Sequence, residues 1–238
     1  MINSYLQDIQ SSSGQFLDEL STRDGTITPK WEKLAKYYEA VGPEKVAEGL
    51  EQVSRQLREN GVTYNLYGDR DGLNRPWNLD PIPMVFDSQE WENIERGLKQ
   101  RAHLLNLILK DIYGNRQLIR DGLIPFELIY HHQGFLREAD KIMLDTDLQL
   151  IQYSADLARG SNGQMWVLDD RTDAPSGAGY TLENRAAMTR VFPELIRENE
   201  VQKISSYYQT LKNTLSHLSS SNIETPRRTG RMYSGSAV

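Results

Sequence analysis

Two strand-like runs joined by a tight-turn sequence restrict the fold of this 238-residue chain more than any other feature. The runs are Leu148–Ala155 and Gln164–Leu168, and Gly160-Ser161-Asn162-Gly163 lies between them. An Asn-Gly pair indicates a β-hairpin because both residues readily adopt the positive φ angles of a two-residue turn. The sequence therefore predicts two antiparallel strands, with acidic residues on both.

The register of this hairpin decides which carboxylates face each other. If Asn162-Gly163 form a two-residue loop, Asp156 lies opposite Asp169. A shift of the loop by one residue instead puts Asp170 or Leu168 opposite Asp156. In each case carboxylates lie opposite or diagonal to one another across the two strands, and direct opposition of like charges costs up to roughly 1 kcal/mol.

The opposed carboxylates need a partner that offsets their charge: a cation, a shared proton or an arginine, such as Arg159 or Arg171. Mg²⁺ is one such cation, because it typically binds one or two protein carboxylates together with nucleotide phosphates. The residues 170–180 that follow contain cationic donors, hydroxyls and glycines, which suit an anion, and Glu183-Asn184-Arg185 begins a helix. Spacing alone nevertheless favours a surface hairpin with solvated acids, because the sequence has neither a P-loop nor a dinucleotide-binding glycine pattern.

Helical spacing of apolar residues and start and stop signals predict helices on both sides of the hairpin. The predicted helices span residues 28–41, 43–60, 87–114, 117–120, 126–130, 182–197 and 201–218. Two further short strands are predicted at residues 62–67 and 82–86, separated by a long loop rich in Gly, Asp and Pro. These elements indicate an α+β protein.

Composition excludes several classes of site. The chain has no cysteine, which excludes disulfides, thiol nucleophiles and thiolate metal sites. Its net charge of −6 argues against general nucleic-acid binding. No segment reads as a signal peptide or a membrane span, so we expect a cytoplasmic protein with no membrane partner. Residues 1–13 are predicted to be flexible, and the Ser- and Arg-rich residues 219–238 to be a disordered tail.

A few other residues suggest sites more weakly. Adjacent histidines, His131 and His132, lack a third ligand, so a metal role is not favoured. Trp77 and Trp91 are interpreted as packing residues. The alternating polar residues Tyr64, Asn65 and Tyr67 could line a substrate cleft.

Several runs resemble those of the circularly permuted type 2 ATP-grasp proteins. The shorter ones are residues 59–65, 75–80 and 155–160. The strongest likeness is the run WVLDDRT at residues 166–172, which continues as APSGAGY at 174–180 and LENR at 182–185. The resemblance covers roughly residues 14–225.

The resemblance implies a fold and an activity. It implies an antiparallel ATP-grasp sheet with flanking helices, in a family related to glutathionylspermidine synthetase. Such a protein is expected to be an ATP- and Mg²⁺-dependent ligase that joins a carboxylate to an amine, as in a peptide bond, through an acyl-phosphate. Its partners would be the nucleotide and a carboxylate–amine substrate pair of unknown identity.

The resemblance also implies roles for individual residues. Asp156 and Asp170 would hold Mg²⁺, with Thr172 where an asparagine is more usual, and this pairing implies the register that puts Asp170 opposite Asp156. Arg171 and Arg185 would stabilise phosphate or acyl-phosphate charge as catalytic residues. The remaining nucleotide-binding residues would be Arg159, Ser176, Gly177 and Asn184.

The likeness covers only the front half of the family pattern. Family members continue with an adenine-gripping part, whereas this chain changes character after Pro226. We therefore expect residues 14–218 to be the N-terminal part of an incomplete domain, as in a truncated or frameshifted product. Such a chain would be inactive alone and would have the missing C-terminal half as a further partner. The alternative is a non-catalytic remnant or interaction module that keeps the fold.

Overall fold

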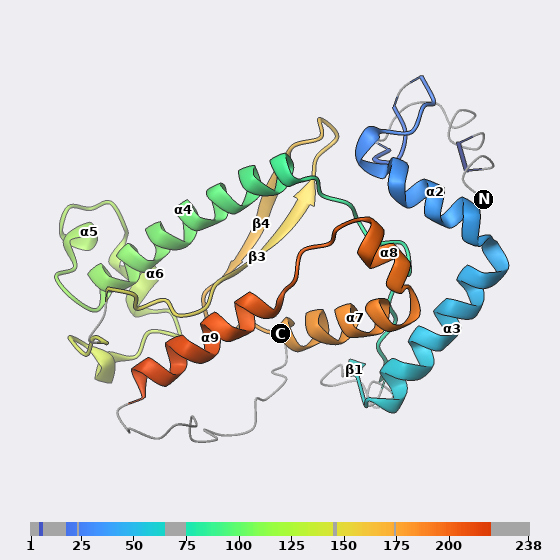
Figure 1. The fold of residues 1–238 in the computed structure, drawn as a ribbon. Helices are drawn as coiled ribbons and strands as arrows, with labels where there is room; N and C mark the ends of the chain where they lie inside the picture. Colours follow the sequence, from blue (N-terminus) through green and yellow to red (C-terminus); the bar gives the residue numbers. More distant parts are fainter. Residues whose placement is uncertain are drawn as a thin grey trace.

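The computed structural model describes residues 5–6, 18–22, 24–64, 75–144, 147–173 and 175–219. Within these residues helices predominate and the strands form two small antiparallel pairs, which confirms the α+β class (Figure 1). The elements in chain order are η1 (Pro29–Trp31), α2 (Glu32–Val41), α3 (Pro43–Glu59), β1 (Thr63–Tyr64), β2 (Arg75–Pro76), α4 (Ser88–Ile112), α5 (Gln117–Arg120), α6 (Phe126–Tyr130), η2 (Arg137–Ala139), β3 (Ser154–Arg159), β4 (Met165–Arg171), α7 (Ala178–Val191), α8 (Pro193–Glu198) and α9 (Ser205–Leu218).

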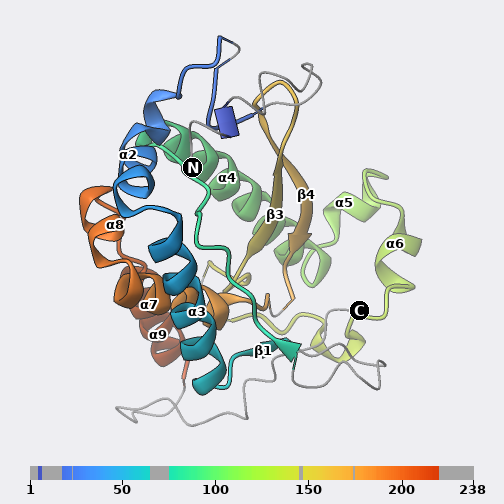
Figure 2. The same ribbon diagram turned by 90° about the vertical axis from the view of Figure 1, so that its right-hand side faces the viewer.

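The hydrophobic core lies between α2 and α3 on one side and α7 and α8 on the other (Figure 2). Both early helices were predicted from apolar residues at helical spacing. Gly42, whose φ of 80° is left-handed, ends α2, and Pro43 begins α3. The buried hydrophobic residues of this core are Trp31, Leu34, Tyr38, Val46, Val53, Leu57, Ala187, Met188, Phe192 and Leu195.

Gly49 of α3 lies directly against the ring of Phe192, between α7 and α8. A Cβ at position 49 would lie 2.4 Å from Cζ of Phe192, so only glycine fits beneath the ring. Leu50, which helical spacing placed on the buried face, is exposed instead. The ring of Phe192 thus occupies the space that a side chain at position 49 would need.

The β3–β4 hairpin closes through a three-residue loop, one residue longer than the first of the alternatives that the sequence left open. The backbone N–H of Gly160 donates to the carbonyl of Gln164 at 2.8 Å, and Gly163 has a φ of 80°. A left-handed residue at the end of a three-residue loop matches the twist of the two strands. Leu157 therefore lies opposite Val167.

A β-bulge then changes the register towards the open end of the hairpin. Leu168 has no partner on β3, so Asp156 lies opposite Asp169 and Ala155 opposite Asp170. The register implied by the family resemblance, with Asp170 opposite Asp156, is therefore wrong. The physical reason is the combination of the three-residue loop with one extra residue on β4.

The hairpin strands lie further along the chain than predicted. Residues 148–153 form no strand, and β3 begins only at Ser154. The side-chain amide of Asn106 on α4 explains the difference. Its Oδ1 accepts the backbone N–H groups of Gln149 and Leu150 at 2.8 and 2.9 Å, which takes the place of a strand partner.

The long helix α4 covers one face of the hairpin and lies behind it in Figure 2. Its start was predicted: Asp87 Oδ1 accepts the backbone N–H of Glu90 at 2.8 Å. The side chains of α4 and the hairpin do not fill all the space between the two elements. A cavity of about 540 Å³ remains between them, lined by Glu90, Asn93, Ile94, Gly97, Leu98, Leu157, Gly163, Gln164, Met165 and Val167.

The strand predictions before α4 are corrected. β1 lies within the predicted strand 62–67, but its partner β2 lies in the segment predicted to be a loop. Residues 82–86 form no strand, because Pro83 lacks an N–H donor and Val85 packs against the helical core. Residues 65–67 lie outside the described residues.

The remaining helix predictions are confirmed with shifted ends. α5 and α6 match the predicted ranges, α7 begins at Ala178 rather than at 182, and α9 begins at Ser205 rather than at 201. The predicted helix 182–197 is divided at Phe192–Pro193. Apart from Tyr5, Leu6 and Ser219, the termini predicted to be flexible lie outside the described residues. No helix in the described part of the chain has the length and apolar character needed to span a membrane.

Candidate functional site

The face of the hairpin turned away from α4 carries two opposed carboxylates with an arginine beside them. Asp156 faces Asp169 across the strands, and their side chains are 49% and 59% exposed. Arg171 Nη2 donates to Asp156 Oδ2 at 2.7 Å, and Arg171 Nε lies 3.8 Å from Asp169 Oδ2. The sequence predicted a cation, a shared proton or an arginine beside the opposed acids, and the structure shows an arginine, Arg171. We call this set, Asp156, Asp169 and Arg171, the open-face cluster.

Two large apolar side chains lie on the same strand close to this cluster. Trp166 is 57% exposed and Leu168 is 69% exposed. The indole Nε1 of Trp166 lies over Gly160, 2.9 Å from where a Cβ would be, so the ring covers the turn end of the hairpin. The open face thus combines exposed apolar surface at one end with charged groups at the other.

The opposite face holds Asp170 against α4. Arg101 Nε and Nη2 donate to the two oxygens of Asp170 at 2.7 and 2.6 Å, a bidentate pair. The hydroxyl of Tyr153 donates to Asp170 Oδ1 at 2.6 Å. Burial, together with this hydrogen bond to the carboxylate, raises the pKa of Tyr153 to about 12. Asp170 is therefore fully engaged between helix and hairpin.

The structure does not bring the predicted metal ligands Asp156 and Asp170 together. Side chains alternate along a strand, so the residue opposite Asp156 and the residue after it point to different faces. Among the described residues, no group of three or more Asp, Glu or His side chains could hold a metal ion. The assignment of Asp156, Asp170 and Thr172 to Mg²⁺ stays a prediction, and it requires Asp170 to leave Arg101 and Tyr153.

Arg101 was not identified from the sequence, although a signal for it exists. It lies three residues after Leu98 and four before Leu105, which were both predicted on one face of α4. Residues at that spacing share a helix face. A lone arginine on an apolar face indicates an acidic partner on the neighbouring element.

Removing the Arg101 side chain should destabilise the chain at neutral pH and matter less in acid. The hydrogen bonds from Arg101 lower the pKa of Asp170 below its ordinary value of about 3.9. A carboxyl with a lower pKa in the folded state stabilises the fold above its unfolded pKa, and this stabilisation is lost as the pH falls through the folded value. Urea unfolding of Arg101→Ala at pH 7 and pH 3 measures the effect.

The expected result is a loss of stability relative to wild type at pH 7 that shrinks at pH 3. Arg96→Ala, on the same helix, is the matched control, because the hydrogen bond of the Arg96 guanidinium within the described part of the chain goes to Asn93, one helical turn away. An equal loss at both pH values would contradict the assignment of Asp170 as the partner of Arg101.

The other predicted ligand-binding residues lie in the segment between β4 and α7 and in α7 itself. Thr172 and Ser176 are exposed, and Gly177 precedes α7 with a φ of 102°. Asn184 Oδ1 accepts a hydrogen bond from Trp77 Nε1 at 2.8 Å, so its side chain serves packing. Trp77 accordingly belongs to the partly buried residues that pack on the core, as interpreted from sequence.

The predicted arginines lie in three different places. Arg171 and Arg159 end their strands at opposite ends of the hairpin. Arg159 forms ion pairs with Glu19 and Glu90. Arg185 Nη1 donates to the carbonyl of Gln202 at 3.0 Å, and no ion pair links it to a carboxylate of the residues described.

The weaker candidates do not form sites in the described part of the chain. His132 Nδ1 accepts the backbone N–H of Gly134, and both histidines follow α6. Tyr64 is exposed, whereas Asn65 and Tyr67 lie outside the described residues. Trp91 is 44% exposed and packs edge-on against Phe86, so its predicted core position is only partly realised.

Curated relatives resemble almost the whole chain. An uncharacterized protein of Mycobacterium tuberculosis is 34% identical over 222 residues, which cover 88% of this chain and 25% of the relative. An uncharacterized protein of Synechocystis is 33% identical over 213 residues, 90% of this chain and 44% of the relative. One from Mycobacterium leprae is 32% identical over 212 residues, 88% and 36%. The chain thus spans between a quarter and less than half of these relatives' length.

The sequence model of the family described as circularly permuted ATP-grasp type 2 matches residues 83–234. The match begins after the predicted start of the likeness at residue 14 and continues past its predicted end at 225. It includes α4, the hairpin with the open-face cluster, the ion pair of Arg101 with Asp170, and helices α7 to α9. The chain therefore belongs to the circularly permuted ATP-grasp type 2 family.

Proposed function

We propose that the open face of the β3–β4 hairpin binds the phosphates of Mg²⁺–ATP. The chain would contribute this face to a ligase that joins a carboxylate to an amine through an acyl-phosphate. The observation that carries the proposal is the open-face cluster: two opposed, half-exposed carboxylates with one arginine between them. Opposed acids are unfavourable in a sheet unless a positive charge compensates them.

The donor set of this cluster fits Mg²⁺ better than the pair implied by resemblance. Asp156 and Asp169 share one face and are open to solvent, whereas Asp170 is occupied by Arg101 and Tyr153. Mg²⁺ commonly takes one or two carboxylates and completes its shell with water and phosphate oxygens. When bound, Mg²⁺ would neutralise phosphate charge at this face.

The arginines would act on the anionic parts of the reaction. The guanidinium of Arg171 ends β4 on the same face and would donate to phosphate oxygens once a divalent cation compensates Asp156 and Asp169. The guanidinium of Arg185, in α7, would stabilise the acyl-phosphate, because its only described contact is a backbone carbonyl. The start of α7 after Gly177 would supply backbone N–H groups for the same anion.

The part of the domain that the relatives carry outside the matched segment would be the main partner. Several large apolar side chains at the α5–α6 end of the molecule are unusually exposed, including Leu123 at 70%, Leu128 at 66% and Ile142 at 69%. Exposed apolar surface of this kind marks an interface. We propose that the remaining part of the domain covers it and supplies the adenine side of the site.

Titration calorimetry of the 238-residue chain with ATP, with and without Mg²⁺, tests the proposal. Mg²⁺ should strengthen binding, and Arg171→Ala should weaken Mg²⁺–ATP binding roughly tenfold, because a charge-assisted hydrogen bond is lost. Arg190→Ala is the matched control, since Arg190 is an exposed arginine of α7. An ATP affinity that changes neither with Mg²⁺ nor in Arg171→Ala would contradict the proposal and favour a non-catalytic module.

A further inference from the structure

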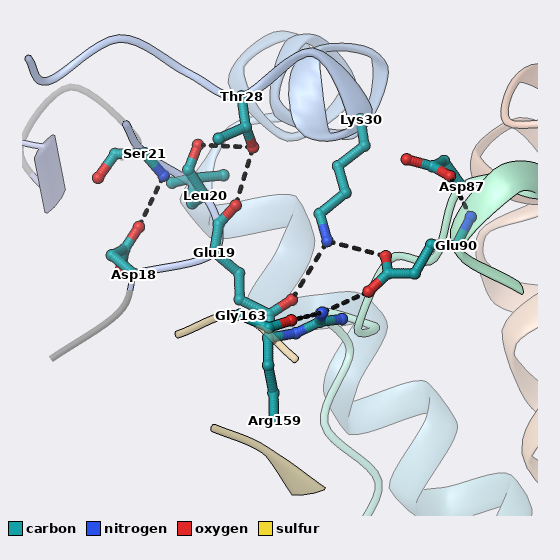
Figure 3. Close-up of polar contacts among 10 residues, drawn as sticks. All are labelled: Asp18, Glu19, Leu20, Ser21, Thr28, Lys30, Asp87, Glu90, Arg159 and Gly163. Carbon is teal, nitrogen blue, oxygen red and sulfur yellow. Dashed lines mark hydrogen bonds and ion pairs between the residues drawn. The ribbon is translucent and has the colours of Figure 1, made fainter. Parts of the chain in front are cut away.

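Four charged side chains meet at the turn end of the hairpin, where Arg159 ends β3 (Figure 3). Arg159 Nε lies 2.6 Å from Glu19 Oε1, and Arg159 Nη1 forms an ion pair with Glu90 at the start of α4. Lys30 Nζ lies 3.2 Å from Glu90 Oε2 and 3.6 Å from Glu19 Oε2. We call this set, Glu19, Lys30, Glu90 and Arg159, the turn-end cluster.

The turn-end cluster joins three distant parts of the chain. Glu19 and Lys30 come from the N-terminal segment, Glu90 from the first turn of α4, and Arg159 from the hairpin. Arg159 Nη1 also donates to the carbonyl of Gly163, which ties the cluster to the hairpin loop itself. The guanidinium lies 5.7 Å from the ring centre of Phe86.

Burial makes Arg159 dependent on these partners. Its side chain is only 10% exposed, and those of Lys30 and Glu90 are 19% exposed. A buried charge that loses its partner is strongly unfavourable, so each acid has a large effect on where the guanidinium can lie. The position of the loop is therefore coupled to α4 through one side chain.

A half-open cavity separates part of the hairpin from α4. A second ionic contact, Arg101 with Asp170, lies near the opposite end of the hairpin. Between the two contacts lies the cavity of about 540 Å³ whose apolar lining includes Ile94, Leu98 and Leu157. Close-packed side chains fix the relative position of two elements by their shape. Because a cavity lies here instead, the two ionic contacts hold the hairpin in position on α4.

We infer that Arg159 is a positioning residue, which fixes the hairpin on α4 and so holds the open-face cluster in place. The expected effect on Mg²⁺–ATP binding rests on the proposed function. Asp156 lies three residues before Arg159 on the same strand, and strand pairing makes the hairpin move as one body. Arg185 lies on a separate helix, so a rotation of the hairpin changes its distance from Arg171. Misplacement by about 1 Å is enough to impair such a site.

The absence of cysteine allows a direct test of hairpin position in the full chain. Spin labels at Gln100→Cys on α4 and Ser161→Cys in the hairpin loop, both exposed positions, report the distance between the two elements by pulsed electron resonance. The parent should give one narrow distance distribution. Arg159→Ala should broaden or shift it, Arg159→Lys should partly restore it, and Arg190→Ala should leave it unchanged.

Glu19→Gln provides a milder variant in case Arg159→Ala fails to fold, because it keeps the shape of the side chain and removes its charge. It should also broaden the distribution. An unchanged distribution in Glu19→Gln and in folded Arg159→Ala would overturn the inference.

Nucleotide binding supplies the second readout. In Arg159→Lys and Glu19→Gln, the ratio of ATP affinity with Mg²⁺ to that without it should fall about fivefold, a change that general destabilisation would not produce. A broadened distance distribution together with an unchanged ratio of the two ATP affinities would overturn the positioning role of Arg159. If wild-type protein showed no Mg²⁺-dependent binding, the proposed function would fail, while the distance measurement would still test how the hairpin is held.

Discussion

Phe192→Ala should destabilise the chain by about 3–5 kcal/mol, the range typical for removing a buried aromatic ring. Phe192 is 3% exposed and belongs to the core that joins α2 and α3 to α7 and α8. Its ring lies against Gly49, which has no side chain of its own to fill the space that the ring would leave. The free energy of unfolding from urea titration, followed by circular dichroism, measures the loss.

Phe126→Ala is the matched control for this substitution. Phe126 is 51% exposed in α6, so the same change should alter stability by no more than about 0.5 kcal/mol. A loss below about 1 kcal/mol for Phe192→Ala would mean that α7 and α8 do not form a common core with α2 and α3. The position of Arg185 on α7 would then need revision.

Asp169→Asn should weaken Mg²⁺–ATP binding at least tenfold, a change of about 1.4 kcal/mol in binding free energy. The substitution removes one of two carboxylates proposed to face the cation, and Asp156→Asn should do the same. Neither change should lower stability, because each relieves the opposition of like charges across the strands. Loss of binding with unchanged or raised stability is typical of a functional residue.

Asp170→Asn distinguishes a metal site at Asp156 and Asp169 from the pair implied by the family resemblance, Asp156 and Asp170. Its side chain contacts Arg101 and Tyr153 on the other face, so it should reduce stability at pH 7 and affect Mg²⁺–ATP binding less than Asp169→Asn. Calorimetric binding and urea unfolding on the same samples measure both effects. The reverse order, with Asp170→Asn abolishing binding and Asp169→Asn neutral, would restore Asp170 as the ligand.

Local signals in the sequence were sufficient to predict the helices up to α6, whereas the division between α7 and α8 was missed. Gly42 and Pro43, the Asp87 cap and the apolar spacing of the early helices predict their ends to within a few residues. These signals act within one or two turns of the chain, so they are visible without tertiary structure. The failures concern positions such as Leu50, where helical spacing cannot show that Phe192 packs on the neighbouring glycine.

The register of the acidic hairpin could not be decided from the sequence. The Asn-Gly pair indicated the hairpin, but not a three-residue loop or the bulge at Leu168. A change of one residue moves every following side chain to the other face. That single residue decides whether Asp169 or Asp170 shares a face with Asp156.

The partners of the predicted arginines were also hidden, because they come from far along the chain. Arg159 lies 140 residues from Glu19, and Arg101 lies 69 residues from Asp170. A motif shared with a family identifies which arginines matter, but it does not show which acid each one contacts. Arg159 was predicted to bind nucleotide, and its observed contacts are acids of the chain itself.

Anomalous diffraction from Mn²⁺ is the most direct test of the proposed site. Crystals of the chain grown with Mn²⁺ and a non-hydrolysable ATP analogue would locate the metal without reference to any substitution. We expect an anomalous peak on the open face of the hairpin, between the carboxylates of Asp156 and Asp169. A peak on the α4 side, bound by Asp170 with Arg101 displaced, would contradict the proposed site.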